Sequence, residues 1–179
     1  MTVDTSLFDD TRTLSGTLYG RMKAACSQDW QDYCHHRFVQ GIADGSLPED
    51  CFRHYLQQDY LFLIHFSRAY ALAVYKADNL EDMRSASDSV GAILGEMTLH
   101  LDYCSQWGMT EADVVKVPEA RANMAYTRYV LERGMAGDIL DLYTALSPCA
   151  VGYAEIGRRL INDPATRKEG NPYWSWIET

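Results

Sequence analysis

A cysteine stands directly after a proline in the apolar stretch 146–157 of this chain. Apolar residues recur there at helical spacing, and a proline inside such a run removes one backbone N–H. We therefore expect a helix that breaks or restarts at Pro148, with Ser147 as its N-cap. Cys149 would then lie among free N–H groups at the positive end of a helix, where thiol pKa values fall, and could act as a nucleophile. The alternative is a buried free cysteine in a kinked core helix.

A carboxylate in an apolar setting is the second candidate. Asp59 lies among aromatic and aliphatic residues and is spaced to share a helix face with Phe62. Because an unpaired buried charge is costly, Asp59 must be hydrogen-bonded or lie beside a polar pocket. The sequence leaves two interpretations open, a ligand-binding carboxylate or an Asp paired with Arg or Tyr inside a helical bundle.

The histidines give a weaker indication of chemistry. Glu96 and His100 are four residues apart, a spacing that can place two metal ligands on one helix face. A di-metal site of this kind needs a second such pair, and no histidine follows His100. We therefore interpret Glu96 and His100 as a hydrogen-bonded pair or an inter-helix contact. His35 and His36 are adjacent, point in different directions on a helix, and are expected at the surface or at a helix end.

The composition limits the class of protein. A chain of 179 residues that is 47% hydrophobic can bury one sizeable core, so we expect one domain over 1–179. A net charge of -9 argues against nucleic acid or an anionic membrane as the main partner and suits a small-molecule ligand. The five cysteines contain no C-x-x-C pair, which favours a reduced, cytoplasmic setting. No export signal or membrane-spanning run is recognised.

The elements that must position these residues are helices. Periodicity and the positions of Gly, Pro and Asn predict helices over 13–26, 30–40, 49–77, 80–106, about 118–133, and 135 or 136 to about 162. Gly41 and Gly134 are expected to end the second and fifth of these, and Thr110 to cap an acidic first turn. The aromatic segment 173–177 looks like the start of an amphipathic helix, so we expect that a C-terminal helix is missing from this sequence.

Several motifs together carry a family resemblance. They are Gln57-Gln58-Asp59, Tyr126, Ser147-Pro148-Cys149-x-x-x-Tyr153-x-x-Ile156-Gly157 and Trp176-Ile177. In their order and spacing, from about residue 10 onward, the chain resembles the TenA/thiaminase II family. The resemblance implies an all-α, haem-oxygenase-like helical bundle that forms a homotetramer and binds no haem or other cofactor. It also implies hydrolysis of aminomethyl-aminopyrimidine, and of thiamin itself, to hydroxymethyl-pyrimidine.

The resemblance assigns roles to five residues of this chain. Cys149 matches the family's nucleophile, and Asp59 matches the aspartate that hydrogen-bonds the aminopyrimidine edge. Phe62 and Tyr126 match residues that line the pyrimidine pocket, and Tyr153 matches a tyrosine whose hydroxyl approaches the thiol. The family's C-terminal acid/base glutamate, and a tyrosine beyond the Trp-Ile segment, have no counterpart before the chain ends at Thr179.

Two other classes of function compete with this hydrolase. A di-iron or di-manganese oxidase of the same architecture would rest on Glu96 and His100. A helical binding or regulatory module would need no catalytic residue, and the acidic composition argues against direct contact with DNA but not against a protein partner. The chemistry of a thiol beside a carboxylate favours the hydrolase, because a thiol is an effective nucleophile near neutral pH.

Overall fold

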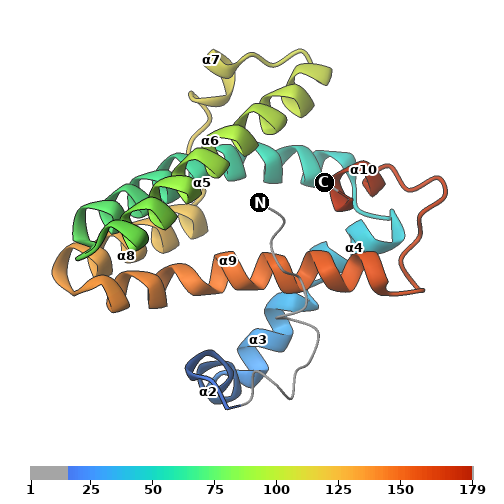
Figure 1. Ribbon diagram of the computed structural model, residues 1–179. Coiled ribbons are helices and arrows are strands. Elements are labelled where there is room, and N and C mark those ends of the chain that lie inside the picture. The colour runs from blue at the N-terminus through green and yellow to red at the C-terminus, as the bar shows by residue number, and fades with distance from the viewer. Residues whose placement is uncertain (1–15, 179) are drawn as a thin grey trace. The chain divides into compact units, whose positions relative to one another are not determined.

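The computed structural model describes residues 16–178, and its regular structure over that range is helical (Figure 1). The helices are α2 (Leu18–Ala25), α3 (Ser27–Cys34), α4 (Arg37–Asp44), α5 (Glu49–Lys76), α6 (Leu80–Gln106), α7 (Glu111–Val114), α8 (Arg121–Ala136), α9 (Ile139–Asn162) and α10 (Trp174–Ile177). The all-α prediction is therefore confirmed. Contacts divide the chain into two compact units, Pro48–Ala150 and the residues on either side of it, and the expectation of one domain stays a prediction.

The predicted helices over 49–77 and 80–106 are confirmed almost to the residue. α5 begins after Pro48 with Glu49 and Asp50 in its first turn, where carboxylates stabilise the positive end of the helix dipole. α6 begins after Asn79, whose side chain accepts a hydrogen bond from the Asp82 backbone N–H at 2.9 Å. α5 packs along α6 and also against α8, so these helices form the frame of the Pro48–Ala150 unit.

The core of this unit follows the spacing of α5. Leu63, Phe66, Ala69 and Ala73 recur every three or four residues and are buried. The cluster that they join takes its other buried members from α6 (Ala86, Ile93), α8 (Val130) and α9 (Leu142, Ala145, Leu146). Because Ala69 and Ala73 are small and have no exposed surface, neighbouring helices can approach α5 closely at these positions.

The predicted end of α8 was wrong. The helix begins at Arg121 and runs through Gly134 to Ala136, although Gly134 was expected to end it. A Cβ atom at Gly134 would lie 2.7 Å from Cδ1 of Leu142, so this glycine is needed for close packing against α9. Gly137 follows the helix instead. The acidic turn at Thr110 is confirmed, as the capping box of the short helix α7.

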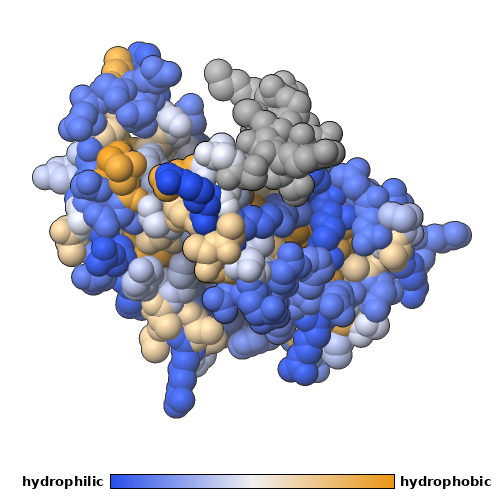
Figure 2. All heavy atoms as spheres, turned by 90° about the horizontal axis from the view of Figure 1, so that it is seen from below, coloured by the Kyte–Doolittle hydropathy of each residue, from blue (hydrophilic) through white to orange (hydrophobic). Residues whose placement is uncertain are grey.

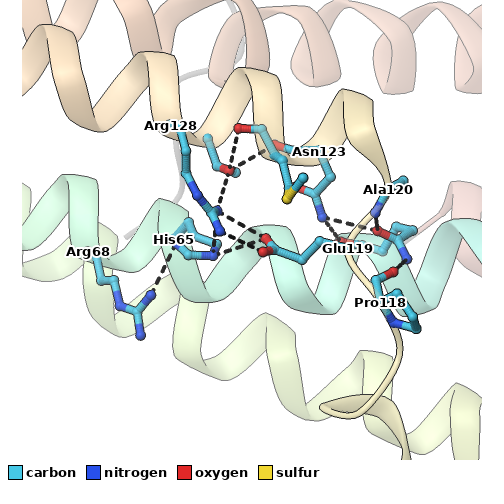
Figure 3. Close-up of polar contacts among 10 residues, drawn as sticks. His65, Arg68, Pro118, Glu119, Ala120, Asn123 and Arg128 are labelled. Atoms are coloured by element: carbon cyan, nitrogen blue, oxygen red, sulfur yellow. Dashed lines mark hydrogen bonds and ion pairs between the residues drawn. The ribbon is translucent and has the colours of Figure 1, made fainter.

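Hydrogen bonds join the segment between α7 and α8 to α5 (Figure 3). The Gln58 amide donates to the Pro118 carbonyl at 2.9 Å and accepts from the Ala120 N–H at 2.7 Å. The Asn123 amide donates to the Gln58 carbonyl at 2.9 Å. The two bonds of the Gln58 amide satisfy backbone groups just before α8, and the Asn123 bond joins α8 to the backbone of α5.

The predicted break at Pro148 was also wrong, because α9 is one helix over Ile139–Asn162 with Pro148 inside it. Asp138 caps its start, since its carboxylate accepts from the Leu140 N–H at 2.8 Å. Pro148 cannot donate to the Thr144 carbonyl, but the Ser147 hydroxyl donates to that oxygen at 2.9 Å. Ser147 thus supplies the missing hydrogen bond inside the helix and is not an N-cap.

The second unit contains α2 to α4, the C-terminal part of α9 and α10. The helix predicted over 30–40 is instead two helices, α3 and α4, separated at His35 and His36. Gly45 ends α4 with a φ of 77°, a left-handed conformation that glycine adopts readily. Both histidines are exposed at helix ends, as expected. The predicted first helix is seen as α2, and its residues Thr13 and Leu14 lie outside the described range.

Two sets of contacts hold this unit together. Glu155 of α9 accepts hydrogen bonds from Lys23 at 2.7 Å and from the Trp30 indole at 3.1 Å. The Asn171 amide donates to the Ile42 carbonyl at 2.9 Å, and Tyr173 donates its hydroxyl hydrogen to the Leu47 carbonyl. The predicted packing face of the aromatic segment is present, because Tyr173 and Ile177 are buried around the single turn of α10.

One face of the surface is mainly hydrophilic. Most residues on the face drawn in Figure 2 are hydrophilic, and the hydrophobic ones form separate small patches. Within residues 16–178, the helices are all too short or too polar to cross a membrane.

Candidate active site

Two buried polar side chains meet between α5 and α6. Nε2 of His100 lies 2.8 Å from Oδ2 of Asp59, and the Tyr55 hydroxyl donates to the same oxygen at 3.0 Å. His100 is 5% exposed and Asp59 8%, so this hydrogen-bonded pair is shielded from water. The inter-helix contact expected for His100 is confirmed, and so is the tyrosine partner considered for Asp59.

His100 is bonded on both sides of its ring. Nδ1 lies 3.0 Å from the carbonyl oxygen of Glu96, one helical turn earlier. Burial lowers the pKa of His100, but the hydrogen bond and charge of Asp59, followed by those of Glu96, outweigh burial and raise it above its ordinary value. His100 is therefore poised to hold a proton in the middle of the bundle.

Cys149 lies on α9, half-buried against the core cluster of the same unit. Because α9 continues through Pro148, the thiol is in mid-helix and no free N–H groups surround it. Burial raises its pKa, and the negative charges of Asp59 and Glu96 raise it further. The expected lowering of the thiol pKa was therefore wrong, and Cys149 rests in the protonated form near neutral pH.

Aromatic rings lie beside the thiol. The rings of Phe62 and Tyr126 are nearly parallel, at 7° and 5.9 Å between centroids, and Phe66 lies 4.9 Å from Phe62. Tyr126 donates its hydroxyl to the Ala145 carbonyl at 2.9 Å. Its pKa is raised by burial and by the neighbouring Cys149. Phe62 and Tyr126 thus belong to one surface of stacked rings around the thiol.

Tyr70 is a residue of this site that the sequence did not indicate. It packs against the same core cluster as Cys149, and burial and then the charge of Cys149 raise its pKa. Its ring packs edge-on to Phe66, at 5.3 Å and 82°. Spacing alone could have placed Tyr70 on the α5 face of Phe62 and Phe66, because the three residues are four apart.

Tyr153 is the one predicted site residue that lies in the other compact unit. It follows Cys149 by one turn of α9, and 40% of its surface is exposed. Its approach to the thiol stays a prediction.

Asp59, Glu96 and His100 were also weighed as metal ligands. One atom of each lies within 4.8 Å of the other two, close enough for a shared ion. However, both ring nitrogens of His100 already face hydrogen-bond acceptors, so a metal would have to displace Asp59 or the Glu96 carbonyl. Glu96 is exposed, and its pKa is raised by burial of its carboxylate region and by Asp59. The arrangement fits a hydrogen-bonded pair of Asp59 and His100 that shares a proton better than it fits a metal centre.

The chain is similar to several known proteins. Residues 24–179 match the model of the TENA/THI-4/PQQC family. An uncharacterized protein of Haemophilus influenzae is 47% identical over 150 residues, which are 84% of this chain and 69% of that protein. An aminopyrimidine aminohydrolase of Halalkalibacterium halodurans is 36% identical over 151 residues, 83% of this chain and 66% of that enzyme. This chain thus spans about two thirds of the length of both relatives.

A solved structure agrees with these matches. The crystal structure of a protein described as a TenA family transcription regulator, from Silicibacter sp. TM1040, has a TM-score of 0.84 to this chain at 46% identity. The similarity covers 89% of this chain and 70% of that one. The two share their fold over the whole region compared.

Proposed function

The chain belongs to the TENA/THI-4/PQQC family, and from this premise we propose that it is a hydrolase of thiamin metabolism. Its substrate is an aminomethyl-aminopyrimidine, with thiamin as a second substrate, and its product is hydroxymethyl-pyrimidine. The name of the relative from Halalkalibacterium halodurans supports this substrate class. We also expect a homotetramer that works in the cytoplasm without a cofactor.

One observation carries the proposal: a thiol, a carboxylate and a stacked aromatic surface lie together in one compact unit. Cys149 is close enough to Asp59 for the carboxylate charge to raise the thiol pKa, and Phe62 and Tyr126 belong to the cluster on which Cys149 packs. A flat heterocycle bound there would lie against the rings while Asp59 accepts a hydrogen bond from its amino group.

The chemistry follows from these residue types. The Cys149 thiolate adds to a carbon of the pyrimidine ring. The electron pair of the broken ring π bond moves to a ring nitrogen, which takes up a proton. The C–N bond at the methylene then breaks and ammonia leaves, or a thiazole leaves when thiamin is the substrate. Water adds to the methylene, the thiolate departs, and the aromatic ring is restored.

This mechanism needs a base, because the resting thiol of Cys149 is protonated. Because its pKa is raised by burial, Asp59 and Glu96, a base must take the proton as the ring binds. Glu96 is exposed as a residue, but burial of its carboxylate region and the charge of Asp59 raise its pKa, which brings it toward the range of a general base. Tyr153 would complete the site by bringing its hydroxyl to the thiol.

Replacement of the nucleophile tests the function. Cys149→Ala should reduce release of ammonia from aminomethyl-aminopyrimidine at least about a thousandfold, on the scale of nucleophile loss in other enzymes, while the circular dichroism spectrum stays unchanged. Cys51→Ser is the matched control, because Cys51 is exposed and should retain wild-type turnover. Turnover by Cys149→Ala at the wild-type rate would contradict the proposal, and thiamin should be assayed in parallel.

A further inference from the structure

The Asp59 carboxylate is bonded on one side only. Oδ2 faces both Nε2 of His100 at 2.8 Å and the Tyr55 hydroxyl at 3.0 Å. No described residue donates a hydrogen bond to Oδ1, and Oδ1 is not among the buried polar atoms that lack a partner. Oδ1 therefore keeps a small accessible surface although Asp59 as a whole is buried, and this is the atom that a ligand could meet.

The hydrogen bonds of His100 fix the number of protons in the pair. The Glu96 carbonyl can only accept, so Nδ1 of His100 must carry a hydrogen and donate it. If Nε2 carried no hydrogen and Asp59 were ionised, two lone pairs would face each other at 2.8 Å. One proton therefore lies between Nε2 and Oδ2, on the nitrogen or on the oxygen.

Both positions of this proton have the same consequence for Oδ1. If the proton is on Nε2, Asp59 is a carboxylate and Oδ1 accepts. If the proton is on Oδ2, Oδ1 is the carbonyl oxygen of a carboxylic acid and again accepts. In neither state can Oδ1 donate a hydrogen bond.

We propose that His100 is a positioning residue that fixes Oδ1 of Asp59 as a hydrogen-bond acceptor and so selects pyrimidines with a ring amino group over those with an oxo group. This inference rests on the proposed function, because it takes a pyrimidine as the ligand that meets Oδ1. An amino group donates to Oδ1, whereas an oxo group would oppose it with lone pairs. The loss of one hydrogen bond to a charged acceptor corresponds to about a tenfold to hundredfold preference.

Loss of His100 should weaken this selection. Without a partner for its proton, the buried Asp59 carboxyl would become a neutral acid. Its O–H could then turn toward the ligand and donate to an oxo group. The other groups that face the pair are Tyr55 from α5, Glu96 from α6 and the Cys149 thiol from α9. Among the described residues, only His100 places a ring nitrogen against Oδ2 that can share its proton.

The test compares the binding of two ligands. The probes are aminomethyl-aminopyrimidine and the analogue in which an oxo group replaces the ring amino group, measured by calorimetry at pH 7 on full-length protein with Cys149→Ala, which prevents turnover. His100→Leu should cut the amino-over-oxo preference at least about fivefold. His100→Gln should restore most of it, because the glutamine amide can donate to Oδ2. Tyr55→Phe is the matched control, since it removes the other donor to Oδ2 and should leave the preference near the wild-type value.

The outcomes separate this inference from the proposed function. If His100→Leu weakens the binding of both ligands equally, His100 is only structural and the inference fails while the function stands. Equal affinity of the otherwise wild-type site for both ligands also overturns the inference. The wild-type protein, which retains Cys149, could show no turnover while the amino-over-oxo preference still depends on His100. That result would support the inference and contradict the proposed hydrolase. If neither ligand binds, both fail.

A measurement on the wild-type protein tests the inference even if the variants fail to fold. Nitrogen-15 NMR of the His100 ring should show a hydrogen on Nδ1 at pH 7. A ring with a bare Nδ1 would overturn the inference, because the proton count depends on that hydrogen.

Discussion

Two histidines of the Pro48–Ala150 unit contact carboxylates at nearly the same distance, and yet their pKa values shift in opposite directions. Nε2 of His100 lies 2.8 Å from Asp59, and Nε2 of His65 lies 3.1 Å from Glu119. The pKa of His100 is raised, whereas the pKa of His65 is lowered. A carboxylate neighbour therefore does not by itself decide whether a histidine is charged.

The remaining neighbours explain the difference. Burial lowers the pKa of His65 most, and the positive charge of Arg128 comes next, with Arg68 adding to it against the pull of Glu119. Arg128 Nη1 lies 2.9 Å from Nε2 of His65, and Arg68 Nη1 lies 3.1 Å from Nδ1 (Figure 3). His100 instead faces only acceptors, the Asp59 carboxylate and the Glu96 carbonyl.

The contrast separates a carboxylate that also pairs with an arginine from one that does not. Glu119 is bridged by Arg128 at 2.6 Å, so its charge is already compensated and His65 can stay neutral. Asp59 has no cation at hydrogen-bonding distance among the described residues except His100. The contact with His100 therefore takes the place of the arginine that compensates Glu119.

Removal of each carboxylate should give the largest difference between the two pairs. Asp59→Leu should lower the free energy of unfolding by about 3–5 kcal/mol, because it leaves a buried histidine without its partner. Glu119→Leu should cost less than about 1 kcal/mol, because its partner Arg128 is half-exposed, at 48%. Urea unfolding at pH 6 measures both.

A double variant controls this comparison. Asp59→Leu combined with His100→Leu should recover part of the loss, since no buried polar group is then left unpaired. Equal losses for Asp59→Leu and Glu119→Leu would show that burial of the first pair has no energetic consequence.

The two histidines should make stability depend on pH in opposite directions. The folded-state pKa of His100 is raised, so its contribution is full below about 6.5, the unfolded value, and is lost as pH rises through the folded pKa. The folded-state pKa of His65 is lowered, so its contribution is full above about 6.5 and is lost as pH falls through the folded pKa. Each slope is at most about 1.4 kcal/mol per pH unit, the value for one proton.

Variants and NMR together test these signs. The difference in unfolding free energy between wild type and His100→Gln should shrink above pH 6.5, and the difference for His65→Gln should shrink below it. NMR titration of the ring protons should place the two pKa values on opposite sides of 6.5. The same sign for both histidines would contradict the account based on their neighbours.

Local signals explain why much of the fold could be predicted from the sequence. Uninterrupted periodicity between Pro48 and Asn79 defines α5, and the same holds for α6 up to Gly108. The prediction failed where a group elsewhere in the structure compensates for a helix-breaking residue or makes use of it. The Ser147 hydroxyl replaces the bond that Pro148 removes, and Gly134 serves packing against Leu142 instead of ending a helix.

The sequence singled out Asp59 and His100 separately but did not predict their contact with each other. Asp59 stood out as a carboxylate among apolar residues, and His100 as one of a pair spaced at i,i+4. Their contact joins residues 41 apart, which no short-range pattern specifies. The raised thiol pKa of Cys149 could not be predicted either, because it depends on burial and on two carboxylates from other helices.

The smallest expected effect comes from Arg128, and it tests the comparison most directly. Arg128→Gln removes the charge that, after burial, does most to lower the pKa of His65, so that pKa should rise toward its ordinary value. Stability should change by no more than about 0.5–1 kcal/mol, because the Arg128–Glu119 pair is partly exposed. NMR titration of His65 measures the shift, with His100 as the internal control that should not move. If His65 keeps its lowered pKa without Arg128, the charge of Arg128 does not explain that pKa, and burial does. The raised pKa of His100 must then come from the strength of its bond to Asp59 and not from the absence of competing cations.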